Sequence, residues 1–186
     1  EKMGARGVPS SVLFFDDVRL PKENLLGGGV GGFRSVMEAL NKSRPIVAAR
    51  AVGLAQGAMD HAIEFARGRR AFGETVSNYQ GIRWMIADMA IQIEAARQLT
   101  YAAAAAVDAG KTGAEMASLA ASAKCFASDV AMKVATDAVQ IFGASGISNE
   151  FPINRYFRDA KVVQIVEGTN QIQRNIVARN LIGKAE

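Results

Sequence analysis

The sequence has almost none of the residues that bind metals or form disulfides. Cys125 is its single cysteine and His61 its single histidine among 186 residues. One cysteine excludes an internal disulfide and fits a reducing compartment. One histidine leaves too few ligands for a usual zinc site and argues against histidine-based catalysis. We therefore expect no bound metal, with Cys125 in a packing role and His61 on the surface of a helix.

Long apolar runs and blocks of basic residues are also missing. No apolar run reaches the roughly 18 residues of a membrane span, so we expect no membrane-spanning helix. The net charge is +4, but lysines and arginines are scattered, which makes nucleic acid a poor candidate for a partner. A mild positive charge is better suited to attracting a phosphorylated small molecule.

No targeting segment is visible, and the first residue is Glu1 rather than methionine. The length fits one domain, or one domain with an appendage. We therefore expect a piece of a longer protein that works in the cytoplasm, or in the mitochondrial matrix if the source is eukaryotic.

Aromatic residues are scarce, at 7%, whereas alanine is abundant. Small side chains let helices approach closely, so this composition favours packed helices over sheets. Residues 101–107 (YAAAAAV) indicate such a seam between helices. Long runs of helical periodicity lie at 33–67, 77–110 and 112–143. Long helices joined by short links predict a mainly α fold, an up-and-down four-helix bundle.

Local signals indicate where the helices begin. Pro45 lies inside the first run and should kink the helix or restart it. Ser77 and Thr112 are each followed, at the third residue, by Gln or Glu, which is the capping-box pattern of a helix start. A short helical segment at 152–163 and a last helix after Gly168 complete the expected bundle.

The N-terminal part of the sequence does not follow the helical pattern. Residues 10–15 (SSVLFF) and 18–20 (VRL) are typical of short strands, whose sheet partners must lie elsewhere because two strands are not stable alone. Residues 27–32 (GGGVGG) match G-x-G-x-x-G, yet no buried strand precedes them and no acidic residue stands about 20 positions on. We interpret this stretch as a hinge between a short β remnant and the bundle.

Three segments between the helices carry candidate chemistry. Residues 69–73 (RRAFG) combine an aromatic ring with arginines, which clamp phosphates, although a solvated basic loop has the same composition. Residues 140–146 (QIFGASG) are small residues that either admit a ligand to the backbone or simply end a helix. Glu167 is a lone carboxylate at a helix start, where the helix dipole stabilises an acid.

Together these segments make the chain resemble the C-terminal half of the acyl-CoA dehydrogenase family. The motifs that carry the resemblance, in order and suitably spaced, are residues 2–26, 69–73, 140–144 and 156–179. Members of that family have an N-terminal helical domain, a middle β domain and a C-terminal helical bundle. The resemblance therefore implies that residues 1–31 are the end of the middle β domain with its hinge, and that residues 32–186 are the bundle.

For activity, the resemblance implies an FAD-dependent enzyme that oxidises acyl-CoA to trans-2-enoyl-CoA and passes electrons to an electron-transferring flavoprotein. It also implies a homo-oligomer, a dimer of dimers. Glu167 stands where the family has the base that abstracts the α-proton while hydride passes to FAD. Some members take the base from the first bundle helix, at a place near Ser43, and this sequence has no carboxylate there.

The resemblance also assigns binding residues. Those that would line the acyl-CoA site are Asn41, Arg44 and Gly168. Those that would meet or lie near FAD are Arg69, Phe72, Gln80, Thr169 and Gln171. Those that would reach the flavin of a neighbouring subunit are Gln140, Gly143 and Ala144. Ala144 stands where the family usually has a second glycine, and Asn41 stands where many members have aspartate.

Two other functions are compatible with the same residues. An acyl-CoA oxidase would deliver the electrons to oxygen, and a non-catalytic bundle would serve only oligomerisation or structure. Glu167 and both flavin-side loops favour an enzyme, but they do not indicate which acyl chain it takes. Because much of the family's flavin site belongs to other domains, we expect this chain alone to fold and to be inactive.

Overall fold

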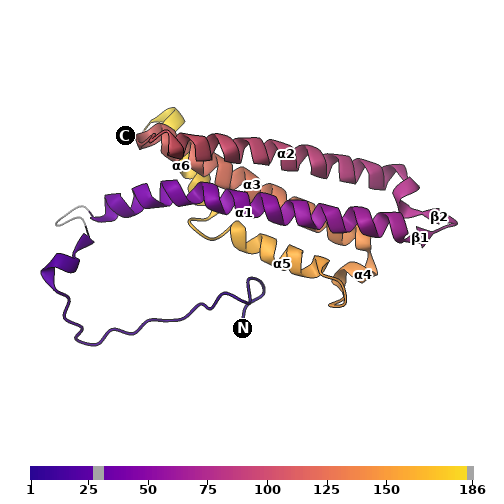
Figure 1. Cartoon of the computed structure of the whole chain (residues 1–186), viewed down its shortest axis with the longest axis horizontal. Helices are drawn as coiled ribbons and strands as arrows, with labels where there is room; N and C mark the ends of the chain where they lie inside the picture. Colours follow the sequence, from indigo (N-terminus) through magenta and orange to yellow (C-terminus); the bar gives the residue numbers. More distant parts are fainter. Residues whose placement is uncertain (27–31, 184–186) are drawn as a thin grey trace.

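Three long helices dominate the computed structural model, which describes residues 1–26 and 32–183 (Figure 1). They are α1 (Gly32–Gly68), α2 (Gln80–Asp108) and α3 (Gly113–Phe142). Consecutive long helices run antiparallel, and all three lie side by side. The shorter helix α5 (Ile153–Val163) packs along α1 and α3 in the fourth position. The predicted mainly α bundle is confirmed, with a short fourth helix.

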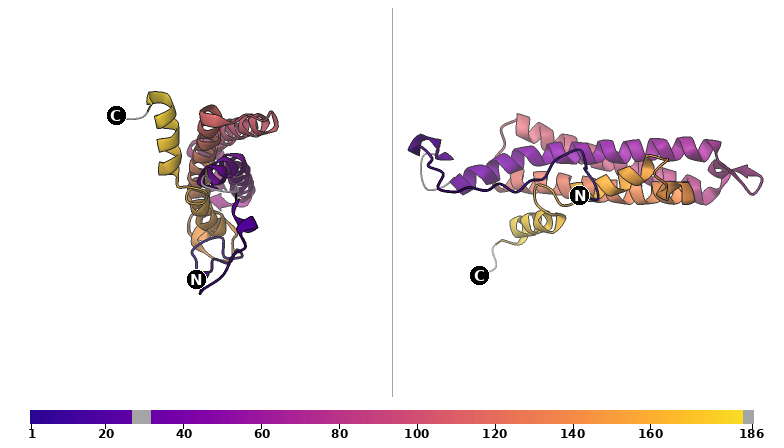
Figure 2. Two further views of the ribbon diagram at one scale, coloured as in Figure 1. Left: turned by 90° about the vertical axis from the view of Figure 1, so that its left-hand side faces the viewer. Right: turned by 90° about the horizontal axis from the view of Figure 1, so that it is seen from below.

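The remaining helices are short or stand at the side of the bundle. Helix α6 (Asn170–Ile182) packs on α3 and projects from the bundle (Figure 2). Helix α4 (Ala144–Ile147) is a single turn, and the 3₁₀ helices are η1 (Lys22–Asn24) and η3 (Val76–Asn78). Within the described residues, no helix has the length and hydrophobicity to cross a membrane.

The core is built from small side chains on the facing sides of the long helices. Ala51 and Ala55 of α1 have no exposed surface, and neither do Ala131 and Ala135 of α3. Residues four positions apart share one helix face, so each pair forms part of a continuous alanine stripe. Because alanine adds little bulk, the two helices pack closely along their length.

Two of the predicted helix starts differ from the structure. Pro45 lies inside the continuous helix α1, so the helix does not restart there. Helix α2 begins at Gln80 after Tyr79, while Ser77 lies within η3, so the capping box predicted at Ser77 is wrong. Thr112 does occupy the N-cap position of α3, but its side chain makes no capping hydrogen bond. Whether a hydroxyl caps depends on the direction of the incoming chain, which sequence spacing does not determine.

The N-terminal segment contains no β-strand. The strands predicted at 10–15 and 18–20 are absent from residues 1–26, all of which are described. The segment is instead exposed, and Phe14 is 90% exposed. A strand forms only beside a hydrogen-bonding partner, and no described strand lies along this segment. The hinge predicted at 27–32 lies, except for its last residue, outside the described residues.

The first residues of this segment are nevertheless fixed to α5. The backbone N–H of Ala5 donates to Asp159 at 2.7 Å, and Arg158 donates to the carbonyl oxygen of Met3 at 2.7 Å. A Cβ on Gly4 would lie 2.3 Å from the carbonyl oxygen of Arg158. The close approach of the two backbones therefore requires glycine.

A small hairpin links α1 to α2. Its strands are β1 (Arg70–Ala71) and β2 (Glu74–Thr75), antiparallel in the register Arg70↔Thr75 and Ala71↔Glu74. The two turn residues, Phe72 and Gly73, have φ values of 49° and 89°. Two consecutive positive φ values are typical of a type I′ turn, which favours asparagine and glycine. Phe72 therefore adopts a strained backbone at the tip of the hairpin.

Candidate active site

The loop between α5 and α6 presents Glu167. The φ value of Glu167 is 54° and that of Gly168 is 96°. A left-handed conformation costs a residue with a side chain about 1–3 kcal/mol, and such strain concentrates at functional sites. The side chain of Glu167 is half-buried. The loop thus holds a carboxylate in a backbone conformation that glutamate does not favour by itself.

Ser43 of α1 is the hydrogen-bond donor to this carboxylate. Its Oγ lies 2.5 Å from Oε2 of Glu167, across a sequence separation of 124 residues. The alternative position for the base, expected near Ser43, therefore lies beside Glu167. A carboxylate at either position would reach the same part of the site.

Arg44 adds a buried positive charge next to the loop. It is only 4% exposed. One terminal nitrogen donates to Oδ1 of Asn41 at 2.7 Å, and Nε makes a longer contact of 3.5 Å with the carbonyl oxygen of Glu167. Burial lowers the pKa of Arg44, and the charge of Glu167 opposes that effect. The predicted acyl-CoA residues Asn41, Arg44 and Gly168 therefore lie together with the predicted base.

Side chains from other helices hold the backbone carbonyl groups of the loop. Nε2 of Gln173, on α6, donates to the carbonyl oxygens of Glu167 at 3.3 Å and of Gly168 at 2.8 Å. Nζ of Lys124, on α3, donates to the carbonyl oxygen of Gly168 at 2.9 Å. Among the described residues, the backbone N–H of Glu167 has no acceptor. The loop thus directs its carbonyl oxygens inward and leaves this N–H available. We call Asn41, Ser43, Arg44, Glu167 and Gly168 the base cluster.

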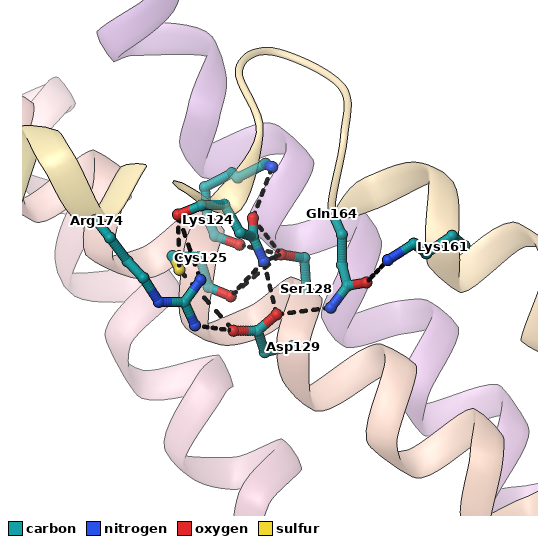
Figure 3. Close-up of polar contacts among 8 residues, drawn as sticks. Lys124, Cys125, Ser128, Asp129, Lys161, Gln164 and Arg174 are labelled. Carbon is teal, nitrogen blue, oxygen red and sulfur yellow. Dashed lines mark hydrogen bonds and ion pairs between the residues drawn. The ribbon is translucent and has the colours of Figure 1, made fainter. Parts of the chain in front are cut away.

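A polar network ties both ends of the loop to α3 (Figure 3). Asn170, the first residue of α6, accepts from Lys124 at 2.9 Å and donates to Ser128 at 2.8 Å. Its amide also donates to Asp129 at 2.7 Å. Gln164, at the other end of the loop, donates to the same oxygen of Asp129 at 2.7 Å. One carboxylate on α3 therefore fixes both ends of the loop that carries Glu167.

A second group of predicted residues lies at the hairpin end of the bundle. Phe72 is 98% exposed, and with Gln140 it lines a pocket of about 510 Å³ whose other walls are largely apolar. Gly143 ends α3 with a φ of 58°. We call the predicted flavin residues at this end the hairpin cluster: Arg69, Phe72, Gln80, Gln140, Gly143 and Ala144.

The hairpin cluster and the base cluster lie far apart. Residues 43 and 68 are both on α1, where a rise of 1.5 Å per residue separates them by roughly 38 Å. One dinucleotide cofactor does not span this distance and also lie beside Glu167. The structure therefore does not bring all the predicted flavin residues of one chain together.

The other two predicted flavin residues lie beside the base cluster. Thr169 is the N-cap of α6, and its Oγ1 accepts from the backbone N–H of Ile172 at 3.4 Å. Gln171 is exposed on the first turn of the same helix. Both lie within three residues after Gly168, so they belong to this end of the molecule rather than to the hairpin end.

The single histidine and the single cysteine lie outside both clusters. His61 is half-buried and packs edge-on against Tyr156, with ring centroids 5.5 Å apart. Cys125 is half-buried, and its Sγ lies 3.7 Å from the carbonyl oxygen of Asn170. In the part of the chain that the structure describes, no group of three or more His, Cys, Asp or Glu residues could hold a metal ion.

Sequence reasoning missed the buried polar side chains behind the loop. Lys124 and Gln173 have no exposed surface, and Asn170 is 3% exposed. Lys124 stands among small residues in ASAKCFAS, on the face that α3 turns toward the core. A charged residue on a face of alanines is the signal that could have found it.

The chain is similar to proteins of known family. The family model described as "Acyl-CoA dehydrogenase, C-terminal domain" matches residues 30–182. The probable acyl-CoA dehydrogenase fadE25 of Mycobacterium leprae (strain TN) is 47% identical over 182 residues, which are 98% of this chain and 46% of that protein. The chain thus spans about half the length of the curated relatives it matches.

Solved structures show the same fold at similar identity. Butyryl-CoA dehydrogenase from Megasphaera elsdenii aligns with a TM-score of 0.94 and 44% identity, covering 98% of this chain and 47% of that chain. A chain from the structure of the electron transferring flavoprotein of Acidaminococcus fermentans aligns with a TM-score of 0.94 and 47% identity, covering 99% of this chain and 48% of that one.

Proposed function

The chain belongs to the acyl-CoA dehydrogenase family, and we propose that it is the C-terminal part of an FAD-dependent enzyme that oxidises an acyl-CoA thioester to a trans-2-enoyl-CoA. The observation that carries the proposal is the Glu167 carboxylate, held by Ser43 on a strained loop beside buried Arg44. Such a carboxylate is positioned rather than free, as a general base must be.

Glu167 takes the proton from the α-carbon of the substrate. As that C–H bond breaks, its electrons form the new double bond between the α- and β-carbons. Negative charge then builds on the thioester oxygen, and the backbone N–H of Glu167, which has no acceptor among the described residues, would donate to it. Gly168 has no side chain, which leaves room for the thioester to approach the backbone of the loop.

Arg44 and Asn41 support the carboxylate from α1. The guanidinium is buried and charged, and its bond to Asn41 at 2.7 Å fixes its orientation. Its positive charge lies next to the loop that carries the Glu167 carboxylate. We propose that both side chains also form the wall of the acyl-CoA site.

The hairpin cluster has the chemistry that FAD requires. The exposed ring of Phe72 offers a stacking face, the amide of Gln140 offers hydrogen bonds, and Arg69 offers a fork for phosphate. The pocket of about 510 Å³ that Phe72 and Gln140 line is largely apolar, which suits an aromatic group. The strain at Phe72 also has a reason if the ring must be presented to a ligand. When bound there, FAD would supply the acceptor for the hydride that leaves the β-carbon.

We propose that the two clusters serve different active sites of a homo-oligomer, a dimer of dimers. Thr169 and Gln171 would complete the flavin site beside their own Glu167. The hairpin cluster, roughly 38 Å away along α1, would contact the flavin of a neighbouring subunit. This extends to Arg69 and Phe72 the neighbouring-subunit role expected for the loop at the end of α3.

The N-terminal segment fits a domain boundary. We propose that residues 1–31 are the end of the middle β domain with its hinge, and that residues 32–186 are the bundle. The exposed apolar side chains at Leu13 (74%) and Phe14 (90%) support this division, because a segment of this kind is covered when it joins a sheet.

An electron-transferring flavoprotein is the proposed electron acceptor. The similarity to a chain from the structure of such a flavoprotein supports this proposal. Production of hydrogen peroxide at the rate of substrate oxidation would instead identify an oxidase. Butyryl-CoA is the first substrate to assay, because one of the solved relatives is named as a butyryl-CoA dehydrogenase.

The test of the proposed function replaces Glu167 by glutamine in the full-length flavoprotein. Glu167→Gln keeps the shape of the side chain and removes the proton acceptor, so flavin reduction by acyl-CoA should slow by about 10²–10⁴-fold. Binding of the CoA ester should persist. Glu150→Gln, at an exposed glutamate before α5, is the matched control and should reduce flavin normally. Reduction of the Glu167→Gln flavin at the parent's rate would show that Glu167 is not the base.

A further inference from the structure

Lys124 is the largest fully buried side chain in the described residues, and it is a cation. No carboxylate oxygen within residues 1–26 and 32–183 forms an ion pair with its Nζ. It also lies against the first residue of α6, where the positive end of the helix dipole disfavours a cation. Burial of an unpaired charge lowers the stability of the fold. A contribution to stability therefore does not explain why a lysine lies at this position.

Both hydrogen bonds of Nζ go to the chain that follows Glu167. Nζ donates to the carbonyl oxygen of Gly168 and to Oδ1 of Asn170, each at 2.9 Å. Gly168 has a φ of 96° and directly follows the strained Glu167. A shift of the Gly168 peptide would re-aim the Glu167 side chain, because the two residues share the strained stretch of backbone.

We propose that Lys124 is a positioning residue for Glu167: its ammonium holds the Gly168 carbonyl group and the Asn170 side chain, and thereby keeps the Glu167 carboxylate aimed at the substrate. The inference rests on the proposed function of Glu167 as the base. Gln173 binds the same carbonyl oxygen, but it belongs to α6, which follows the loop and would move with it. Lys124 belongs to α3 in the bundle core, so it anchors the loop to a rigid element.

The charge of Lys124 depends on pH in an accessible range. Burial lowers the pKa of Lys124 to about 8, and Arg44 on α1 acts in the same direction. Cys125 and Asp129 on α3, and Glu167 on the loop, act in the opposite direction. A neutral amine keeps N–H donors but loses the charge that strengthens its hydrogen bonds. The hold on the loop should therefore weaken as the pH rises through about 8.

The test replaces Lys124 by methionine in the full-length, FAD-loaded protein. Lys124→Met keeps the length of the side chain and removes its charge and donors. The rate constant of flavin reduction at saturating acyl-CoA should fall by roughly 10- to 100-fold, as misplacement of a reacting group predicts. The affinity for acyl-CoA should change little. Lys133→Met, at an exposed lysine of the same helix that pairs with Asp137, is the matched control and should match the parent.

The pH profile separates positioning by charge from a merely structural role. The rate of the parent should decline as the pH rises through about 8, and this decline should be absent from the already slow Lys124→Met protein. A merely structural role would lower the rate and leave the profile unchanged. Lys124→Gln keeps a neutral donor, and it is the second variant if Lys124→Met does not retain FAD; its profile should also lack the decline.

Glu167→Gln, measured beside these variants, distinguishes two failures. If it reduces flavin at the parent's rate, the base is not Glu167 and the inference fails with the proposed function. If it is inactive while the Lys124 variants keep the parent's rate or the parent's alkaline decline, Lys124 is not a positioning residue and the assignment of the base stands.

Discussion

At the scale of single residues, the site depends on two consecutive left-handed positions. Glu167 carries the carboxylate, and Gly168 makes the chain turn inward to the donors of Lys124 and Gln173. Sequence reasoning identified Glu167 through its motif. It did not identify Lys124, because that side chain acts on the loop across a sequence separation of 44 residues.

Gly168 offers a test of this geometry. A Cβ on Gly168 would lie 2.8 Å from Nε2 of Gln173, at a φ of 96° that residues with side chains avoid. Gly168→Ala should therefore destabilise the chain by about 1–3 kcal/mol in urea unfolding. It should also slow flavin reduction in the full-length enzyme, since Glu167 shifts with its neighbour.

Gly53 supplies the control for that substitution. It is exposed within α1, and a Cβ there would meet nothing within 4 Å. Gly53→Ala should stabilise the helix by roughly 0.5–1 kcal/mol. Equal effects of Gly53→Ala and Gly168→Ala on stability would contradict the strain assigned to the loop.

Lys124 should also make stability depend on pH. Its pKa in the folded chain is about 8, against an ordinary value of 10.5, so between these values the unfolded chain binds a proton that the folded chain has released. The free energy of unfolding should therefore rise with pH in this window, by at most about 1.4 kcal/mol per pH unit. Below about pH 8 the cost of burying the ammonium is fully present.

Urea unfolding at a series of pH values measures this effect. The rise between pH 8 and 10.5 should be missing from Lys124→Met and present in Lys133→Met, whose lysine is exposed. An unchanged rise in Lys124→Met would assign it to other groups.

At the scale of elements, helical periodicity predicted the long helices closely. The run predicted at 33–67 is α1 (Gly32–Gly68), and the segment predicted at 152–163 is α5 (Ile153–Val163). Helical periodicity depends only on residues within the helix, so a short stretch of sequence is enough to predict it. Strands differ, because their hydrogen bonds go to another segment. The stretch at 10–15 has strand composition and no strand partner among the described residues.

The docking of the N-terminal segment on α5 gives a prediction at this scale. Gly4→Ala would place a Cβ 2.3 Å from the carbonyl oxygen of Arg158, so the segment should detach from α5. Its first residues should become more sensitive to protease, and the amide of Ala5 should lose hydrogen-exchange protection. Gly7→Ala is the matched control, since a Cβ at Gly7 meets nothing within 4 Å. Protection of Ala5 in the Gly4→Ala chain would count against the docked arrangement.

At the scale of the whole molecule, the proposal that neighbouring subunits share each active site can be tested by mixing variants. A doubly substituted protein, Arg69→Ala with Phe72→Ala, should retain little FAD because every flavin loses the hairpin contacts. Glu167→Gln should retain FAD and be inactive. When the two proteins are co-expressed, mixed oligomers should contain sites with an intact base from one chain and an intact hairpin from the other.

Activity of the mixed oligomers decides this point. Dehydrogenation above the sum of the two separate proteins is expected. If the mixture has only the summed activity while gel filtration confirms mixed oligomers, the hairpin cluster does not complete a neighbouring subunit's site and the shared-site proposal is wrong.

The chain of residues 1–186 by itself should fold without becoming an enzyme. Its helices bury their faces on one another, so circular dichroism should show a helical protein. The exposed apolar side chains of the N-terminal segment should promote self-association, visible by light scattering. Only part of the proposed flavin site is present, so the preparation should be colourless and inactive. A yellow, active preparation would contradict the proposed division of the site.

The sequence by itself determined the long helices, the family and the residue predicted to be the base. These features depend on residues that are close together in the sequence, so the sequence alone predicts them. They are the helical periodicity, the glycines after helices and the motifs around Phe72 and Glu167. The domain division at residues 1–31 and the flavin roles of the hairpin cluster stay predictions, since their partners lie outside this chain.

Only the tertiary structure decided which of these residues share a site. It placed Ser43 beside Glu167, brought Lys124 and Asn170 behind the loop, and set the hairpin cluster at the other end of α1. The physical reason is that a helix carries residues apart at 1.5 Å each, while packing between helices joins residues over a hundred positions apart in the chain. Spacing in the sequence predicts the distance between residues along one helix, but it does not predict which residues of different helices pack together.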